Sequence, residues 1–239
     1  MRYITTSWDD GFPADERIAD LLDKYNLSAT FYIPRENSEN VVMSEGEIQS
    51  LSQRFEIGGH TLHHKRIHSQ SERLFKEEIG GCFNWLTDLL KNEPVSFCFP
   101  GGIYNRKAVE YVLKTGFKII RTTELLNITS TPNAIINTTL QIYNHATLTY
   151  LKHLLKRKKF GSIRLYMKVK GSDDLLKLVD FYLNHVIQNG GCFHIWGHSW
   201  EIEANSLWFD LERIFKMISK ISECTYVSNA GLLNYKTSH

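Results

Sequence analysis

The chain opens with the segment YITTSWDDG at residues 3–11, in which a strand-like run ends in two adjacent carboxylates and a glycine. The β-branched and aromatic side chains predict a strand over residues 3–8. A helical pattern then begins at Pro13 and ends near Asn26, and a second strand-like run, SATFYI, occupies residues 28–33. A strand, a helix and a strand in immediate succession predict parallel strands joined by a crossover helix.

The same alternation continues along the chain. Further strands are expected at residues 55–57, 95–99, 117–122, 192–197 and 225–228, and further helices after Ser44, from Ser69 to Lys91, from Asn105 to Gly116, and over 172–188 and 205–221. The middle of the chain, residues 123–170, is expected to hold one strand at 140–143 and one basic helix at 147–159. We therefore predict an α/β fold in one domain, residues 1–239. Its form should be a distorted or incomplete (β/α) barrel of seven strands with functional groups at the carboxyl ends of the strands.

The composition argues against several broad classes of protein. The net charge is only +2, so no strong field favours nucleic acid as a partner. No run of about 18 apolar residues predicts a transmembrane helix. No signal-peptide pattern precedes the first strand, so we expect a cytoplasmic protein. The four cysteines are isolated and form no CxxC pair, which favours reduced thiols over a cysteine metal site.

Two polar clusters follow predicted strands in the first third of the chain. Asp9 and Asp10 come directly after the first strand, where a turn with an acidic residue at a helix start explains them equally well. The second cluster is HTLHH, in which His60 and His64 are four residues apart. On one helical turn both rings would face the same way, which is metal-ligand spacing, although a pair of surface histidines is the alternative.

A third cluster, FHIWGHSWE, lies at residues 193–201. Because side chains alternate along a strand, His194, Trp196 and His198 should share one face. His194 is plausible as a buried core histidine. His198 lies past the strand end, where its side chain can reach a site.

Together and in this order, the clusters resemble the polysaccharide deacetylase family (carbohydrate esterase family 4, with its nodulation-protein-like deacetylases). The family's first motif, Thr/Ser-Phe-Asp-Asp-Gly, is matched by SWDDG at residues 7–11, and its second, His-Ser/Thr-x-x-His, by HTLHH at 60–64. Its third motif, a proline and a glycine after a strand, is matched loosely by FPGG at 99–102, and its last by the strand that runs into His198. The resemblance covers roughly residues 3–200.

The resemblance implies a role for each matched side chain. Asp9 would be the general base and His198 the general acid. One divalent metal, for which zinc is the first choice, would be held by Asp10, His60 and His64. The metal would activate water and polarise an amide carbonyl.

The chain also departs from the family pattern. The third motif usually has an arginine two residues before its proline, where this chain has Cys98, and Arg121 at the end of the next strand is the candidate replacement as partner of Asp9. No aspartate that would support the acid histidine is identifiable, and Glu201 is the candidate substitute. We also expect a backbone N–H near Gly101 to bind the oxyanion, and Trp200 to support the site or contact substrate.

The resemblance implies a hydrolase that removes an N-acetyl or other acyl group from an amino sugar. The expected substrate is nucleotide-linked or lipid-linked, an intermediate of bacterial surface polysaccharide biosynthesis. A cyclic amide or imide hydrolase of the same fold is one alternative, but metal-free relatives of that kind tend to lose the ligand triad. A non-catalytic sugar-binding relative is the other, and it would be expected to lose Asp9 or His198.

The stretch 151–171 contains eight lysines or arginines and no acidic residue. Leu151, Leu154 and Leu155 share one helical face within it. One interpretation is a solvated helix whose leucines pack on the barrel. The other is a peripheral surface for anionic lipid headgroups or for the phosphates of an activated sugar.

Overall fold

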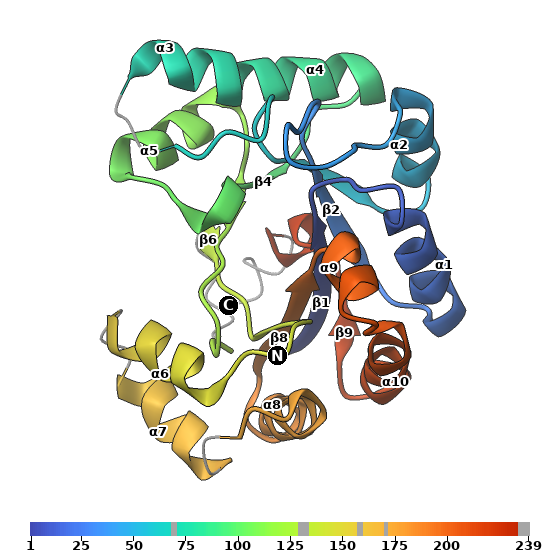
Figure 1. Cartoon of the computed structure of the whole chain (residues 1–239), viewed down its shortest axis with the longest axis vertical. Helices are drawn as coiled ribbons and strands as arrows, with labels where there is room; N and C mark the ends of the chain where they lie inside the picture. Colours follow the sequence, from blue (N-terminus) through green and yellow to red (C-terminus); the bar gives the residue numbers. More distant parts are fainter. Residues whose placement is uncertain (68–70, 129–133, 157–159, 170–171, 234–239) are drawn as a thin grey trace.

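The computed structural model describes residues 1–239 apart from 68–70, 129–133, 157–159, 170–171 and 234–239. At its centre is a curled sheet of parallel strands (Figure 1). The order across the sheet is β6-β5-β4-β3-β2-β1-β8-β7, and β9 pairs with β1 outside this path. The strands are β1 (Arg2–Asp9), β2 (Ala29–Ile33), β3 (Glu56–Gly59), β4 (Ser96–Cys98), β5 (Ile119–Arg121), β6 (Ile135–Ile136), β7 (Leu140–Gln141), β8 (Gly191–Gly197) and β9 (Thr225–Tyr226).

The barrel is completed by one short run of chain. Residues 135–141 contain both β6, which pairs with β5, and β7, which pairs with β8. The described strands therefore occupy seven positions around the ring, with β6 and β7 sharing one of them. The predicted single-domain fold class, a distorted (β/α) barrel, is confirmed.

Helices cover the outside of the curled sheet (Figure 1). They are α1 (Asp15–Tyr25), α2 (Glu45–Ser52), α3 (Glu72–Phe75), α4 (Gly81–Leu90), α5 (Arg106–Thr115), α6 (Thr147–Lys156), α7 (Phe160–Lys168), α8 (Leu175–Asn189), α9 (Ser199–Ala204) and α10 (Trp208–Ile218). A π-helical turn, Lys76–Gly80, joins α3 to α4. In the described chain no helix is both long and apolar enough to cross a bilayer.

Side-chain alternation along β1 separates an apolar outer layer from a polar barrel interior. Trp8 is fully buried and its ring meets Phe215 of α10 at 5.9 Å between centroids. Ser7 faces the opposite way, with Oγ 2.9 Å from Nε2 of the buried His194. Because interior polar groups must find hydrogen-bond partners, this side of the sheet is suited to holding ionisable side chains.

The chain after β9 closes the end of the barrel opposite the site. Asn229 is fully buried; its Nδ2 donates to the Tyr32 hydroxyl at 2.8 Å, and its Oδ1 accepts from Thr5 Oγ1 at 3.0 Å. The backbone N–H of Ala230 donates to Glu56 Oε2 at 2.8 Å. The last described residues thus bind the interior faces of β1, β2 and β3.

Some elements differ from the sequence-based expectation. Helices α7 and α9 were not expected, and the helix expected over 205–221 is shorter, as α10. Ser69, the expected start of the next helix, lies outside the described residues. The N-cap of α3 is Ser71, whose side chain accepts a hydrogen bond from the Leu74 backbone N–H. Short helices such as α9 span fewer than two turns, so their apolar period is too brief to recognise.

Candidate functional site

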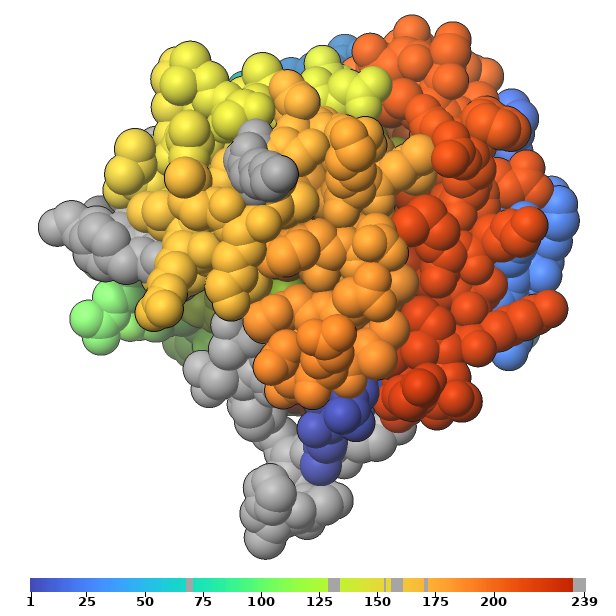
Figure 2. Space-filling view, turned by 90° about the horizontal axis from the view of Figure 1, so that it is seen from below, coloured from blue at the N-terminus to red at the C-terminus, as the bar shows by residue number. Residues whose placement is uncertain are grey.

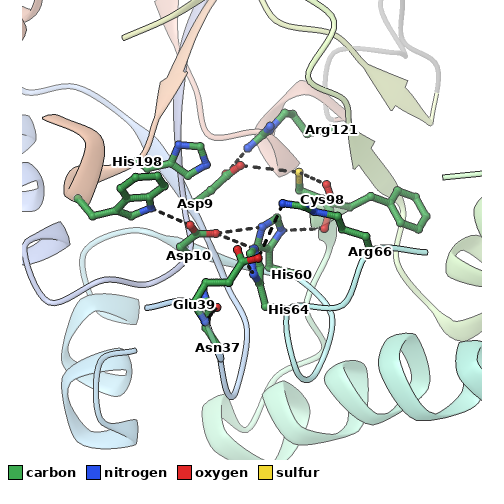
Figure 3. Close-up of polar contacts among 12 residues, drawn as sticks. Asp9, Asp10, Asn37, Glu39, His60, His64, Arg66, Cys98, Arg121 and His198 are labelled. Atoms are coloured by element: carbon green, nitrogen blue, oxygen red, sulfur yellow. Dashed lines mark hydrogen bonds and ion pairs between the residues drawn. The ribbon is translucent and has the colours of Figure 1, made fainter. Parts of the chain in front are cut away.

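Three side chains of metal-binding type converge at the carboxyl ends of β1 and β3 (Figure 3). Asp10 follows β1, His60 follows β3, and His64 comes from the loop after it. Asp10 Oδ1 lies 3.0 Å from His64 Nε2 and 3.4 Å from His60 Nε2. One ligand atom from each residue lies within 4.8 Å of the others. The structure therefore brings together the three side chains that the sequence proposed as ligands.

The local conformation that achieves this is not the expected helical turn. Residues 60–64 form a loop, and Thr61 and His64 have left-handed backbones with φ of 62° and 54°. These two reversals, rather than the four-residue helical repeat, turn both rings toward Asp10. The expectation of a helical turn was wrong because a four-residue spacing does not distinguish a helix from a loop.

Glu78 holds this loop in place from the π-helical turn. Its carboxylate is fully buried and accepts from the His63 backbone N–H at 3.0 Å, while its own carbonyl accepts from Leu62 N–H at 2.9 Å. His63 Nδ1 lies 2.9 Å from Glu78 Oε1, and Lys65 Nζ lies 3.2 Å from the same oxygen. His63 is thereby bound to Glu78 and is not part of the triad with Asp10. Sequence reasoning missed Glu78 because acidic residues in a helical pattern are common on exposed faces and give no sign of burial.

The triad fits a divalent cation. His60 Nδ1 lies 2.9 Å from the Cys98 carbonyl oxygen, an acceptor that assigns the proton to Nδ1 and leaves the lone pair of Nε2 toward Asp10. Asp10 Oδ1 is buried without a hydrogen-bond donor. An ionised oxygen facing two imidazole nitrogens is a donor set that zinc and similar ions prefer.

Asp9 is paired with a cation from across the barrel. Arg121, the last residue of β5, is fully buried and donates through Nη2 to Asp9 Oδ1. The guanidinium also lies over the rings of Tyr32 and Trp196, at 5.0 and 4.7 Å from their centroids. Cys98 Sγ is 4.0 Å from the other oxygen, Oδ2. The contact expected between Arg121 and Asp9 is therefore present in the structure, with a thiol where the family motif has its arginine.

His198 follows β8 and lies beside Asp9, near Asp10 (Figure 3). Its Nδ1 is 2.6 Å from Glu201 Oε2, which also accepts from Gln141 Nε2 at 2.9 Å. Burial alone would lower the pKa of His198, but Glu201, Asp10 and Asp9 together raise it to about 9. The imidazole is therefore protonated at neutral pH, and its free nitrogen, Nε2, can donate that proton.

Two further residues of the predicted site are Trp200, which contacts Asp10, and Gly101, which lies in an exposed turn. Trp200 Nε1 donates to Asp10 Oδ2 at 2.8 Å, so the indole orients a proposed metal ligand. Gly101 is exposed in a turn after β4 with φ of 64°, where a Cβ would lie 3.2 Å from Arg66 Nε. Arg66 in turn lies 3.9 Å from Glu39, whose other oxygen is 3.8 Å from His64 Nδ1. Sequence analysis did not identify Arg66 or Glu39.

The family model for polysaccharide deacetylase matches residues 1–120, half of the chain. The chain belongs to the polysaccharide deacetylase family. The matched residues include Asp9, Asp10, His60 and His64. This family acts on acetylated carbohydrates and is in general metal-dependent. No curated protein matches the chain.

Solved deacetylases share this fold at low sequence identity. A peptidoglycan N-acetylglucosamine deacetylase is 17% identical over 97% of this chain and 88% of its own, with a TM-score of 0.60. A family 4 carbohydrate esterase from Streptomyces lividans, solved with acetate, is 15% identical over 94% and 91%, with a TM-score of 0.56. A Streptococcus pyogenes deacetylase, also solved with acetate, is 18% identical over 56% of this chain and 62% of its own, with a TM-score of 0.50. At these identities the likeness establishes the fold.

Proposed function

We propose that the chain is a metal-dependent hydrolase that removes an N-acetyl or related acyl group from an amino sugar. One observation supports this above the others. A metal-type triad of Asp10, His60 and His64 lies beside a separately paired carboxylate, Asp9, and a protonated imidazole, His198. Hydrolysis of an amide needs these three functions together, namely an activated water, a base and an acid for the leaving amine.

A divalent ion, with zinc as the first choice, would polarise the acyl carbonyl and lower the pKa of a water molecule. Arg121 occupies Oδ1 of Asp9, so Oδ2 is the oxygen that accepts the proton of the attacking water. Glu201 holds Nδ1 of His198, so Nε2 donates a proton to the departing nitrogen as the C–N bond breaks. A backbone N–H near Gly101 would stabilise the oxyanion. The products are a carboxylate and the free amino sugar.

The position of His198, held by Glu201 at 2.6 Å, suits proton donation to the nitrogen of an amide substrate. An amine is a poor leaving group until it gains a proton, whereas an alkoxide needs that help less. We therefore propose an N-acylated amino sugar as the substrate, in nucleotide-linked or lipid-linked form, from bacterial surface polysaccharide biosynthesis.

Metal analysis combined with an acetate-release assay tests the proposal. The panel would contain an N-acetylated amino sugar in free, nucleotide-linked and lipid-linked forms, an O-acetylated sugar and a cyclic imide. We expect stoichiometric metal, loss of activity after chelation, recovery with zinc, and release from an N-acetyl substrate. Metal-free turnover of the imide would instead identify a cyclic amide hydrolase. Sugar binding without turnover of any compound would identify a non-catalytic relative.

A further inference from the structure

Helices α6 and α7 form a pair at the edge of the molecule, beside α8 (Figure 1). Their inner sides meet through Tyr150 and Tyr166, which are fully buried with ring centroids 5.5 Å apart. Tyr182 of α8 belongs to the same buried cluster. Figure 2 shows the residues of these three helices, from yellow to orange, covering one side of the molecule. The pair is thus anchored by its aromatic side, and its other side is turned to solvent.

The solvent side of the pair is unusually apolar. Leu148, Leu155 and Met167 are 60%, 64% and 59% exposed. They are three of the seven large apolar side chains that are strongly exposed in the described chain. A helix that merely packs on the barrel would bury its leucines. Leu154 does so, at 2% exposed, whereas Leu155 points away.

Cations lie among these apolar side chains. On α6, Leu148, Lys152 and Leu155 follow one another at spacings of four and three residues and so form one stripe. On α7, the exposed residues beside Met167 are Arg164 and Lys168. Residues 147–168 contain no aspartate or glutamate. We call these six side chains the α6–α7 face: Leu148, Lys152, Leu155, Arg164, Met167 and Lys168.

A chain of hydrogen bonds connects the start of α6 to the acid side of the site. His145 Nε2 lies 2.9 Å from Gln141 Oε1, and Gln141 Nε2 donates to Glu201, the partner of His198. Because α6 follows β7 at its carboxyl end, the pair rises from the same rim of the barrel as the site. The start of α6 therefore lies at the active-site rim.

We propose that the α6–α7 face binds the surface of an anionic phospholipid bilayer. Apolar side chains that enter the headgroup boundary, flanked by cations on two helices without acidic residues, match the chemistry of such a surface. A nucleic acid backbone would use the cations but give no role to three exposed apolar side chains. The inference rests on the proposed function in one respect: attachment would bring the site to a lipid-linked amino sugar.

Vesicle co-sedimentation of the full chain tests the proposal. Vesicles of phosphatidylcholine alone are compared with vesicles that contain phosphatidylglycerol as well. We expect binding to the anionic vesicles to be at least about tenfold stronger and to weaken as salt is raised. Equal binding to both kinds of vesicle, or to neither, would overturn the proposal.

Two variants of the face separate charge from insertion. Charge reversal at Lys152, Arg164 and Lys168 to Glu should reduce binding to anionic vesicles at least about tenfold. Its control reverses the same number of exposed charges on and beside α5, at Lys107, Lys114 and Lys118, and should bind as the wild type does. Unchanged binding by the first variant, or equal losses in both, would overturn the proposal.

The second variant changes Leu148, Leu155 and Met167 to Ser, and its binding to anionic vesicles should also fall severalfold. Wild-type binding by this variant would identify a polyanion site that acts through charge alone, and would overturn the proposal. Acetate release from a soluble substrate should be unchanged in all three variants. A chain that binds vesicles but releases no acetate would refute the proposed function and leave the membrane surface standing.

Discussion

The two halves of the chain contribute different kinds of side chain to the site. Residues 1–120, which the family model matches, supply the triad of Asp10, His60 and His64. Each of these follows a strand end, and Asp10 and His64 have positive φ angles of 80° and 54°. The second half supplies side chains that contact the first: Arg121 to Asp9, and Trp200 to Asp10.

The two halves of the chain therefore have different roles in the site: the first positions the metal ligands, and the second adjusts the side chains around them. In the first half, backbone turns determine where the ligands lie, so changes there should alter metal occupancy. In the second half, hydrogen bonds and charges adjust side chains already in place, so changes there should alter rate, pH dependence or stability while metal is retained. Asp9 is the exception, because it belongs to the first half but is paired with Arg121 and not with the triad.

His60→Ala should abolish metal binding and activity together. Loss of a residue that hydrogen-bonds to a metal ligand typically weakens metal binding about 10–100-fold. Loss of the ligand itself should weaken metal binding by a larger factor. His63→Ala is the matched control, since His63 contacts Glu78 and not Asp10. Metal content of the purified proteins measures the effect. Stoichiometric metal in His60→Ala, or its loss in His63→Ala, would show that the wrong histidine was assigned.

Asp9→Asn should keep its metal and lose about 10²–10⁴-fold in rate, the range expected for a general base. Asp10→Asn provides the comparison, because it should lose the metal as well. The two substitutions are adjacent and chemically identical, so metal content and acetate release distinguish their roles directly. Normal turnover by Asp9→Asn would remove Asp9 from the mechanism.

Arg121→Met should lower the free energy of unfolding by about 3–5 kcal/mol, because the buried Asp9 carboxylate loses its partner. Adding Asp9→Asn should recover much of that loss, since no unpaired charge then remains. Chemical denaturation of the two single variants and the double variant completes the cycle. A double variant no more stable than Arg121→Met would contradict the pairing.

Glu78→Gln should weaken metal binding about 10–100-fold without removing any ligand, the usual cost of losing a supporting partner. The neutral amide no longer neutralises the charge of Lys65, and it accepts a weaker hydrogen bond from the His63 backbone N–H. The loop that contains His64 is therefore positioned less firmly. Titration of the apoprotein with zinc measures the change. Glu72→Gln, an exposed residue of α3, is the control, and equal affinities in the two variants would argue against the role of Glu78.

Glu201→Gln should shift the alkaline limb of the pH–rate profile to lower pH. An acid works while protonated, so with a pKa of about 9 His198 loses its proton, and the rate falls, only as pH rises through about 9. Without the Glu201 charge the pKa should move toward its ordinary value of 6.5. The rate near pH 6 should change least. Glu203→Gln on the same helix is the control, and an unmoved limb in Glu201→Gln would exclude Glu201 as the partner of the acid.

Much of the site was predictable because each cluster follows a strand, and parallel strands bring their carboxyl ends together. Arg121 was recognisable for the same reason, once Cys98 was seen to stand at the motif arginine. The contacts that cross between elements distant in sequence, such as Trp200 to Asp10, were not predictable, since no local pattern records them.

The fold was predictable to a similar degree. The alternation of strands and helices is a strong periodic signal, and it indicated the barrel. The region after β5 was harder, because β6 and β7 are two residues each and give no period to recognise. The basic composition of 151–171 gave no sign that this stretch contributes to two helices, α6 and α7. Residues 157–159, part of the helix expected there, lie outside the described residues.

The pairing of β1 with β8 has a consequence for synthesis of the protein. The partner of Arg2 is Gly191, so one edge of β1 has no neighbour until most of the chain has left the ribosome. At roughly 5–20 residues per second, that wait is on the order of 10–40 s. An unpaired strand edge is a template for association with other chains. The nascent chain should therefore depend on a chaperone, or on transient covering of β1, until its second half emerges.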